Sequence, residues 1–147
     1  MVISIELYSD DRHRSQVAAL WEKVFAYDAP HNKPTLAIDR KLAVDDELFF
    51  VAVAGPSVVG TIMAGYDGHR GWIYSVAVAP SHRRQGLGTR LVIHAERALI
   101  SQGCVKINLQ ILEANQSVVE FYAKLGYTEE KRINMGKRIP VNVPCSG

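Results

Sequence analysis

The sequence predicts an α/β fold built on a mixed sheet. Segments with alternating or continuous apolar residues, typical of strands, take turns with segments whose apolar residues recur every three or four positions, typical of helices. In the middle of the chain a strand pattern, a glycine-bearing turn, a helix pattern and a second strand pattern follow one another. That order predicts a parallel strand pair with a right-handed crossover. The earlier strands are joined by short turns, which predicts antiparallel pairing in the first half.

The first half of the chain contains the patterns of four strands and two helices. The segment Val2–Tyr8 alternates apolar and polar residues, as a half-buried strand does. The apolar stripe that follows, from Val17 to Phe25, is typical of an amphipathic helix. The predicted strands are Val2–Tyr8, Leu48–Ala54, Val58–Tyr66 and Trp72–Ala79, and the second helix covers Thr35–Val44.

The second half predicts two more helices and two or three more strands. Apolar residues from Leu87 to Leu99 recur on one helical face, and Gly103 stands where a C-terminal cap is expected. Asn115 is suited to cap the start of the next helix, which Gly126 ends. The remaining elements are a strand at Cys104–Ile111 and a last strand or strand pair at Tyr127–Ile139. We therefore expect a six- or seven-stranded sheet flanked by about four helices.

Length and composition favour one cytoplasmic domain without a membrane, nucleic-acid or metal partner. The 147 residues fit a single domain, which we expect over residues 1–139, with a tail at 140–147. A net charge of +2 is too small to indicate a nucleic-acid or membrane partner. Cys104 and Cys145 belong to no CxxC pair, which favours reduced thiols. The sequence has neither a signal-peptide pattern nor an apolar run long enough to cross a bilayer.

The turn before the central helix is suited to bind an anion. Gly86 and Gly88 let the backbone approach a ligand, and the first amides of a helix have no partner within it. Arg83 and Arg84 add positive charge. The turn lacks the GxxxxGK[ST] string of a P-loop, and Leu91 stands where a Rossmann GxGxxG motif needs its third glycine.

Two strings resemble one enzyme family. Arg83-x-x-Gly86-x-Gly88, after a strand ending in Val-Ala-Val-Ala-Pro, resembles the coenzyme A pyrophosphate loop of the GNAT superfamily of N-acetyltransferases. The segment Asn115–Tyr127 (NQSVVEFYAKLGY) is similar to the closing helix of that superfamily, and the order of strands and helices matches over nearly the whole chain. The turn Gly65–Gly71 looks like that of one bacterial branch, the YpeA-like acetyltransferases.

The resemblance implies a GNAT-like fold with acetyl-CoA as co-substrate. In that fold the strand Trp72–Ala79 splays from the strand Cys104–Ile111, and the pantetheine arm enters between them like an added strand. The backbone of Val76 and Val78 would receive pantetheine, the turn amides would receive the pyrophosphate, and Asn115 would meet the pantetheine arm. The implied cofactor-binding residues are Val76, Ala77, Val78, Arg83, Arg84, Gln85, Gly86, Leu87, Gly88, Thr89 and Asn115.

The resemblance also implies how the chemistry is divided. Tyr122 occupies the position of the general acid that protonates the departing thiolate. A backbone amide of the splayed strand, at Val78, would polarise the thioester carbonyl. The general base is not assigned, because Gln110 stands where several relatives carry a glutamate. The remaining candidates for the base are Asp67, His69 and Glu113.

The acceptor is expected among the loop Asp28–Pro34, the helix Thr35–Val44 and the turn Asp67–Gly71. The polar side chains of these segments would suit a carboxylate or phosphate on a small substrate; they include Asn32, Arg40, Lys41 and Arg70. The candidate substrate-binding residues are Asn32, Arg40, Asp67 and His69. A protein N-terminus, a lysine side chain, an amino acid and an aminoglycoside all stay open as acceptors.

The sequence therefore predicts an N-acetyltransferase, monomeric or homodimeric, that moves an acetyl group from acetyl-CoA to a primary amine by direct attack in a ternary complex. The first alternative is a non-catalytic acyl-CoA-binding or sensing module with the same fold, favoured by the missing carboxylates. The second is a nucleic-acid-binding module built on Arg83-Arg84 and Lys137-Arg138. That alternative lacks a basic face or an aromatic platform in the sequence.

Overall fold

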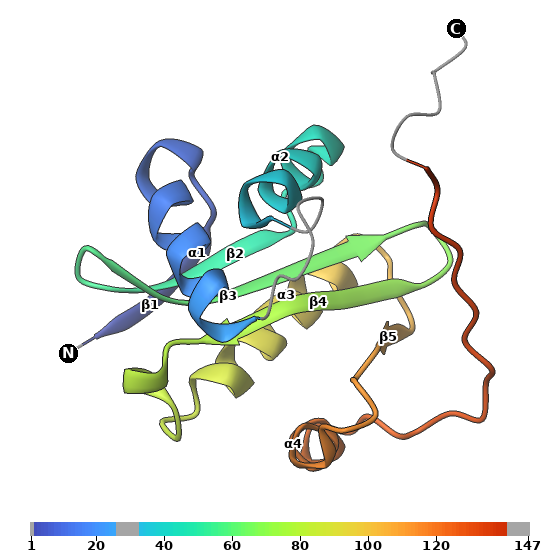
Figure 1. Ribbon diagram of the computed structural model, residues 1–147. Coiled ribbons are helices and arrows are strands. Elements are labelled where there is room, and N and C mark those ends of the chain that lie inside the picture. The colour runs from blue at the N-terminus through green and yellow to red at the C-terminus, as the bar shows by residue number, and fades with distance from the viewer. Residues whose placement is uncertain (1, 26–32, 141–147) are drawn as a thin grey trace, which may run out of the picture. The chain divides into compact units, whose positions relative to one another are not determined.

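The computed structural model describes residues 2–25 and 33–140. It consists of two compact units, Met1–Gln110 and Ile111–Gly147 (Figure 1). The first unit contains the sheet and the helices α1, α2 and α3, and the second contains α4. The assignment of residues 1–139 to one domain stays a prediction.

The first unit is built on one mixed sheet of five strands in the order β1-β2-β3-β4-β5. The first three pairings are antiparallel and the last, between β4 and β5, is parallel. This confirms the α/β fold with a mixed sheet and the crossover predicted in the middle of the chain. The strands are β1 (Ile3–Leu7), β2 (Phe49–Ala54), β3 (Ser57–Tyr66), β4 (Gly71–Val78) and β5 (Ile107–Leu109).

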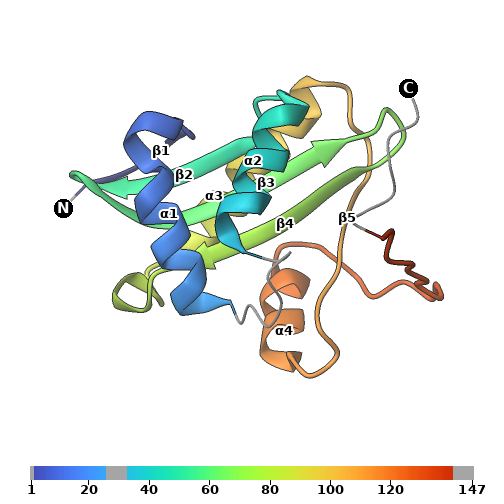
Figure 2. The same ribbon diagram turned by 45° about the horizontal axis from the view of Figure 1, so that its top comes forward.

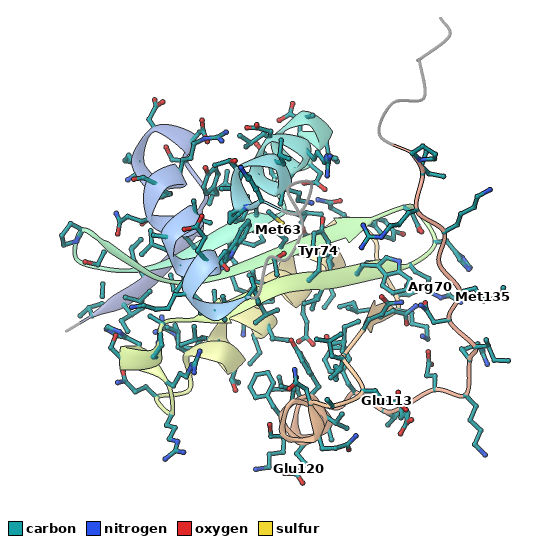
Figure 3. All side chains as sticks on the ribbon, viewed as in Figure 1. Met63, Arg70, Tyr74, Glu113, Glu120 and Met135 are labelled. Atoms are coloured by element: carbon teal, nitrogen blue, oxygen red, sulfur yellow. The ribbon has the colours of Figure 1, made fainter. Side chains whose placement is uncertain are left out.

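The expectation of a sixth or seventh strand is wrong. Residues 127–140 form no strand, and the Tyr127–Ile139 prediction failed because this segment does not bury an apolar face. Four charged residues interrupt it at 129–132, and beyond them the side chains of Ile133 and Met135 are 92% and 88% exposed. The Met135 side chain projects from this extended segment in Figure 3. Strand pairing is stabilised by side-chain contacts on a shared face, which this segment lacks.

The helices of the first unit cover both faces of the sheet. Figures 1 and 2 show α1 and α2 on one face and α3 on the other. Asp10 and Asp11 lie in the first turn of α1, where the helix dipole favours negative charge. Pro34 opens α2, at the position that tolerates its missing N–H. The helices are α1 (Asp10–Val24), α2 (Pro34–Val44), α3 (Leu87–Ser101) and α4 (Gln116–Lys124), with a short 3-10 helix at Pro80–His82.

The core of the first unit fills both sides of the sheet. Trp21 of α1, Ile38 of α2 and Met63 of β3 belong to one buried cluster (Figure 3 labels Met63). On the opposite face, Leu91 and Leu99 of α3 are fully buried. The apolar stripe read from the sequence therefore explains why these helices dock where they do. Within the described part of the chain, no helix combines the length and the apolar character that crossing a bilayer requires.

Candidate active site

A β-bulge interrupts β4 in the middle of its pairing with β3. Thr61 lies opposite Ala77 and Met63 lies opposite Tyr74, so that Ser75 and Val76 together face the single residue Ile62. Ser75 has a φ of 52°, in the left-handed region that a non-glycine residue adopts only at an energetic cost. A bulge of this kind bends its strand and redirects the backbone groups beyond it.

Two hydrogen bonds of the buried Thr61 hydroxyl hold the bulge in place. The indole Nε1 of Trp21 donates to Thr61 Oγ1 at 2.8 Å, and Thr61 Oγ1 donates to the carbonyl oxygen of Ser75 at 3.0 Å. Thr61 is fully buried, as is Trp21. Sequence reasoning missed this relay, although a threonine inside the apolar strand VVGTIMAG is a signal that a buried hydroxyl needs partners.

Beyond the bulge, one edge of β4 is left without strand pairing. β4 and β5 pair only from Gly71 to Ile73, whereas β4 continues to Val78. The N–H of Ala79 donates to Val59 in β3. Successive residues of a strand point their backbone groups in opposite directions, so the N–H of Val78 points away from β3, toward the edge that β5 has left. This is the edge at which the sequence predicted Val76 and Val78 to bind a ligand; Ala77 between them is buried in the core.

The turn between β4 and α3 presents a row of unpartnered amides. Arg84 and Gly86 both have positive φ, 64° and 76°, and Gly86 is the N-cap of α3. The N–H groups from Arg84 to Thr89 have no acceptor among residues 2–25 and 33–140, and the first helical bond is donated by Arg90 to Gly86. Unpaired amides at the positive end of a helix dipole bind anions. The fold and this turn define an α/β protein suited to a phosphorylated ligand.

The side chains of this turn differ in what they can offer a ligand. Arg83 Nε donates to the carbonyl oxygen of Val78 at 3.2 Å, which ties the turn to the end of β4. Arg84 and Gln85 are exposed, whereas the Leu87 side chain is buried and leaves only its backbone for binding. The predicted binding roles of Gly88 and Thr89 likewise rest on their amides.

Tyr122 and Asn115 belong to the second unit. Tyr122 is a buried residue of α4. Its ring packs edge-on against those of Phe121 and Tyr127, with 4.9 and 5.7 Å between the ring centroids. Burial raises the pKa of the Tyr122 phenol to about 12. Asn115 lies at the N-cap of α4, as predicted, but its side chain makes no capping hydrogen bond. Its carbonyl oxygen accepts from Val118 instead. The roles of both residues toward a ligand stay predictions.

The turn between β3 and β4 holds Asp67 and His69. Asp67 Oδ1 accepts the N–H groups of His69 and Arg70, each at 2.7 Å. The N–H groups of Arg70 and His69 lower the pKa of the Asp67 carboxyl, which is therefore ionised at neutral pH. His69 and Arg40 are exposed. Asn32 lies outside the described residues, and Glu113 belongs to the second unit.

A pocket of 640 Å³ opens in the first unit beside the bulge. Its lining includes Asp67, Trp72, Tyr74, Ser75 and Gln110, whereas Arg40 and His69 do not line it. The structure thus brings together Asp67, Gln110 and the bulge, but not the full set of predicted substrate residues. Sequence reasoning missed the two aromatic residues, although their i, i+2 spacing on a strand places them on one face.

Lys41 also lines this pocket, but not as a free cation. Its ammonium group donates to Asp46 Oδ2 at 2.8 Å and to the carbonyl oxygen of Ala64, and it lies 5.4 Å from the centre of the Tyr74 ring. The ammonium group of Lys41 is thus already engaged by two oxygen acceptors, and its role in binding an anionic substrate group stays a prediction. Among the described residues, no cluster of histidine, cysteine or acidic side chains is arranged to hold a metal ion.

Comparison with known proteins places the chain in a family. It matches the acetyltransferase (GNAT) family over residues 13–127. It is 39% identical over 140 residues to an acetyltransferase of Yersinia pestis (strain Pestoides F), which covers 95% of this chain and 98% of the relative. Its fold is similar to that of Ard1 from Thermoplasma volcanium, with a TM-score of 0.75 at 23% identity, over 87% of this chain and 84% of that one. It is also similar to AAC(6')-Iy in complex with the bisubstrate analogue CoA-S-monomethyl-acetylneamine, with a TM-score of 0.76 at 16% identity, over 95% and 100% of the two chains.

The chain belongs to the acetyltransferase (GNAT) family. It is an acyl-CoA-dependent acetyltransferase, as the strings around Gly86 and Asn115 predicted.

Proposed function

We propose that the protein transfers an acetyl group from acetyl-CoA to a primary amine by direct attack in a ternary complex. The observation that carries this proposal is the row of unpartnered amides from Arg84 to Thr89, next to a strand edge that β5 leaves after Ile73. A fold neighbour, AAC(6')-Iy, is known in complex with a bisubstrate analogue that contains CoA, which supports a CoA site in this fold.

The cofactor is held mainly by backbone groups. The diphosphate accepts from the amides of the turn and gains from the dipole of α3. The pantetheine arm pairs with Val76 and Val78 along the open edge of β4, as an added strand would. The side-chain amide of Asn115 makes no capping hydrogen bond to α4 and can therefore bind a ligand. Backbone recognition of this kind explains why Leu87 serves the site although its side chain is buried in the core.

The thioester carbonyl is polarised by a single backbone donor. The Val78 N–H points toward the open edge of β4, and the Trp21–Thr61–Ser75 relay holds the strand that carries it. As the amine attacks, negative charge develops on the carbonyl oxygen, and a donor already in position stabilises that charge. Collapse of the tetrahedral intermediate releases the CoA thiolate and leaves the amide product.

Tyr122 supplies a donor for the departing thiolate. Its pKa of about 12 keeps the phenol protonated throughout the neutral range. A thiol has a reference pKa of about 8.5, so complete proton transfer from this phenol is uphill by about 3.5 pKa units. The role that fits best is therefore a strong hydrogen bond to the developing thiolate, which takes its own proton from water.

The acceptor amine loses its proton to water. Gln110 lines the pocket but cannot take a proton. The lowered pKa of Asp67 makes its carboxylate a weak base near neutral pH. A base on the protein is not needed where a chain of water molecules leads from the amine to solvent.

The proposal is tested in two steps. A thermal-shift screen compares acetyl-CoA, free CoA, NAD and ATP, and only the two CoA species should raise the melting temperature by mass action. Release of free thiol from acetyl-CoA is then measured over a panel of primary amines. Turnover that depends on the amine supports acetyl transfer, and no shift with either CoA species contradicts it.

The alternative is an acyl-CoA-binding module that does no chemistry. Gln110 favours this alternative. It lines the pocket, and it stands at the position where the resemblance to the superfamily leads us to expect a glutamate. The same experiment separates the two functions. A thermal shift with acetyl-CoA but no thiol release with any amine supports the binding module.

A further inference from the structure

We propose that the pocket beside the bulge binds acceptors that carry a second positive charge, so that one amine reacts near Ser75 while a distant ammonium group rests between Trp72 and Asp67. This inference rests on the proposed acetyl transfer and adds the class of acceptor, a diamine. It replaces the sequence-based expectation of an acceptor with a carboxylate or phosphate.

The buried cation of the pocket, Lys41, already has partners within the protein. Lys41 is 7% exposed, and its ammonium group contacts Asp46, the Ala64 carbonyl oxygen and the face of Tyr74. An ammonium group has three donors, and two of them already have oxygen acceptors. An anionic substrate group would have to displace these partners from a buried site, at the cost of leaving Asp46 unpaired.

One negative charge in the pocket lining, that of Asp67, remains without an ion-pair partner among the described residues. Asp46 is neutralised by Lys41, and its other oxygen accepts the N–H of Leu48. Asp67 is then the ionisable lining residue whose charge no ion pair balances. The guanidinium group of Arg70 is turned to the carbonyl oxygen of His69, at 3.0 Å, and does not line the pocket. The pocket therefore presents a net negative charge at its Asp67 end.

Two aromatic side chains of β4 line one side of the pocket. Trp72 and Tyr74 are two residues apart on β4 and share the face that carries α1 and α2 (Figure 3 labels Tyr74). Their side chains are 37% and 41% exposed. Gly65 lies opposite Trp72, and the Tyr74 ring lies beside Gly65 on the same face. Because Lys41 covers the Tyr74 ring, the indole of Trp72 is left as the surface for a cation–π contact with a ligand.

The distance along β4 from Trp72 to Ser75 suits a chain with an amine at each end. Ser75 lines the same pocket and lies at the bulge, next to the open edge of β4 where we place the thioester. Residues of a strand are about 3.3 Å apart, so Trp72 and Ser75 are about 10 Å apart along β4. A flexible chain of several carbons spans that length. A simple monoamine that reaches Ser75 leaves the Asp67 end of the pocket empty.

The test compares diamines with matched monoamines. Acetyl-CoA turnover is measured with the terminal diamines of propane through octane and with the corresponding alkylamines. We expect kcat/KM for the best diamine to exceed that of the alkylamine of equal length by about tenfold, the size of one ion pair plus one cation–π contact. The preference should reach its maximum at an intermediate chain length.

Asp67→Asn tests the charge without removing the turn. Asparagine keeps the side-chain oxygen that accepts from His69 and Arg70. KM for the diamine should rise about tenfold, so that the ratio of kcat/KM for the diamine to kcat/KM for the alkylamine falls toward one. Trp72→Leu should lower the same ratio. Asp11→Asn, which removes the same charge from the exposed first turn of α1, is the matched control and should change neither substrate.

The outcomes separate this inference from the proposed function. Equal kcat/KM for diamines and alkylamines, or an Asp67→Asn variant that keeps a full diamine preference, overturns the diamine pocket and leaves acetyl transfer intact. If no amine is acetylated, the proposed function fails, and calorimetric titration of the diamines into wild type and Asp67→Asn still decides the pocket. Binding that is lost in the variant supports it, and absent or unchanged binding overturns it.

Discussion

Thr61 Oγ1 donates a hydrogen bond to the carbonyl oxygen of Ser75, 3.0 Å away, across the bulge between β3 and β4. The same hydroxyl accepts from Trp21 Nε1 at 2.8 Å, so one buried threonine connects α1 to the strand that we propose to carry the thioester. The left-handed backbone at Ser75 is thereby fixed from inside the core. The shape of the open edge of β4 thus depends on a residue that lies inside the core.

Thr61→Val removes this connection without changing the volume of the core. The indole N–H of Trp21 then has no acceptor, and a buried donor left unsatisfied costs about 1–3 kcal/mol. We expect the free energy of unfolding in urea to fall by that amount and the Kd for acetyl-CoA to rise. Thr35→Val, at an exposed position of α2, should stay within about 0.5 kcal/mol of the wild type. A Thr61→Val protein as stable as the wild type would show that the relay does not hold the bulge.

Gly86→Ala tests the backbone of the amide turn. Gly86 has a φ of 76° and no atom near enough to collide with a new Cβ, so the substitution adds strain of about 1–2 kcal/mol without a clash. Relief of that strain should turn the neighbouring amides, and calorimetry should show weaker binding of acetyl-CoA. Gly55→Ala introduces the same strain at a φ of 60° in the β2–β3 turn. This control should lose similar stability and keep its Kd, and equal losses of affinity in both variants would speak against a special role for the turn.

Tyr122→Phe tests the donor to the thiolate. Loss of one positioned donor to a developing negative charge costs about 10²–10³-fold in rate, so kcat should fall about a hundredfold or more while KM for acetyl-CoA changes little. Because the pKa of Tyr122 is about 12, its ionisation should not lower kcat of the wild type below about pH 11. The phenol oxygen has no hydrogen-bond partner within the described residues, so the melting temperature should hardly change. An undiminished kcat would remove Tyr122 from the mechanism.

His13 makes the stability of the first unit depend on pH. The ring is buried, its Nδ1 accepts the N–H of Ser9 at 2.9 Å, and burial lowers the pKa of His13 despite the nearby Glu6. A histidine with a depressed pKa stabilises the fold above its unfolded pKa of about 6.5, and that contribution is lost as the pH falls through the folded pKa. Urea unfolding should therefore show stability falling below pH about 6.5, by up to about 1.4 kcal/mol per pH unit for each proton.

His13→Asn is the variant that isolates this contribution. Asparagine keeps an acceptor for Ser9 but does not titrate, so the loss of stability in acid should become smaller. It should not vanish, because burial lowers the pKa of His94 as well. An acid dependence identical to that of the wild type would place the titrating group elsewhere.

The local patterns predicted most of the fold, because periodicity reports which face of an element is buried. The helix bounds, the antiparallel first half and the crossover all follow from it. The prediction of a strand at Tyr127–Ile139 was wrong because the scattered apolar residues of this segment do not line one face. The turn before α3 could be predicted because its backbone has a positive φ at Gly86, a conformation that favours glycine.

Features that depend on contacts between distant segments could not be predicted. The positive φ of Ser75 follows from the pairing of β4 with β3 and from Thr61, fourteen positions away. Lys41 resembles an exposed cation in the sequence, but α2 packs on the sheet and buries it against Asp46 and Ala64. The burial of Lys41 is the reason why the class of acceptor that we propose differs from the one expected from the sequence.

The central claim, that the amides from Arg84 to Thr89 bind the diphosphate of acetyl-CoA, is tested most directly by hydrogen–deuterium exchange resolved at single residues. These amides have no acceptor in the described part of the chain and should exchange rapidly in the free protein. Addition of acetyl-CoA or CoA should protect them, and NAD should not. Amides that are already protected in the free protein, or that stay unprotected when acetyl-CoA is bound, would contradict the account.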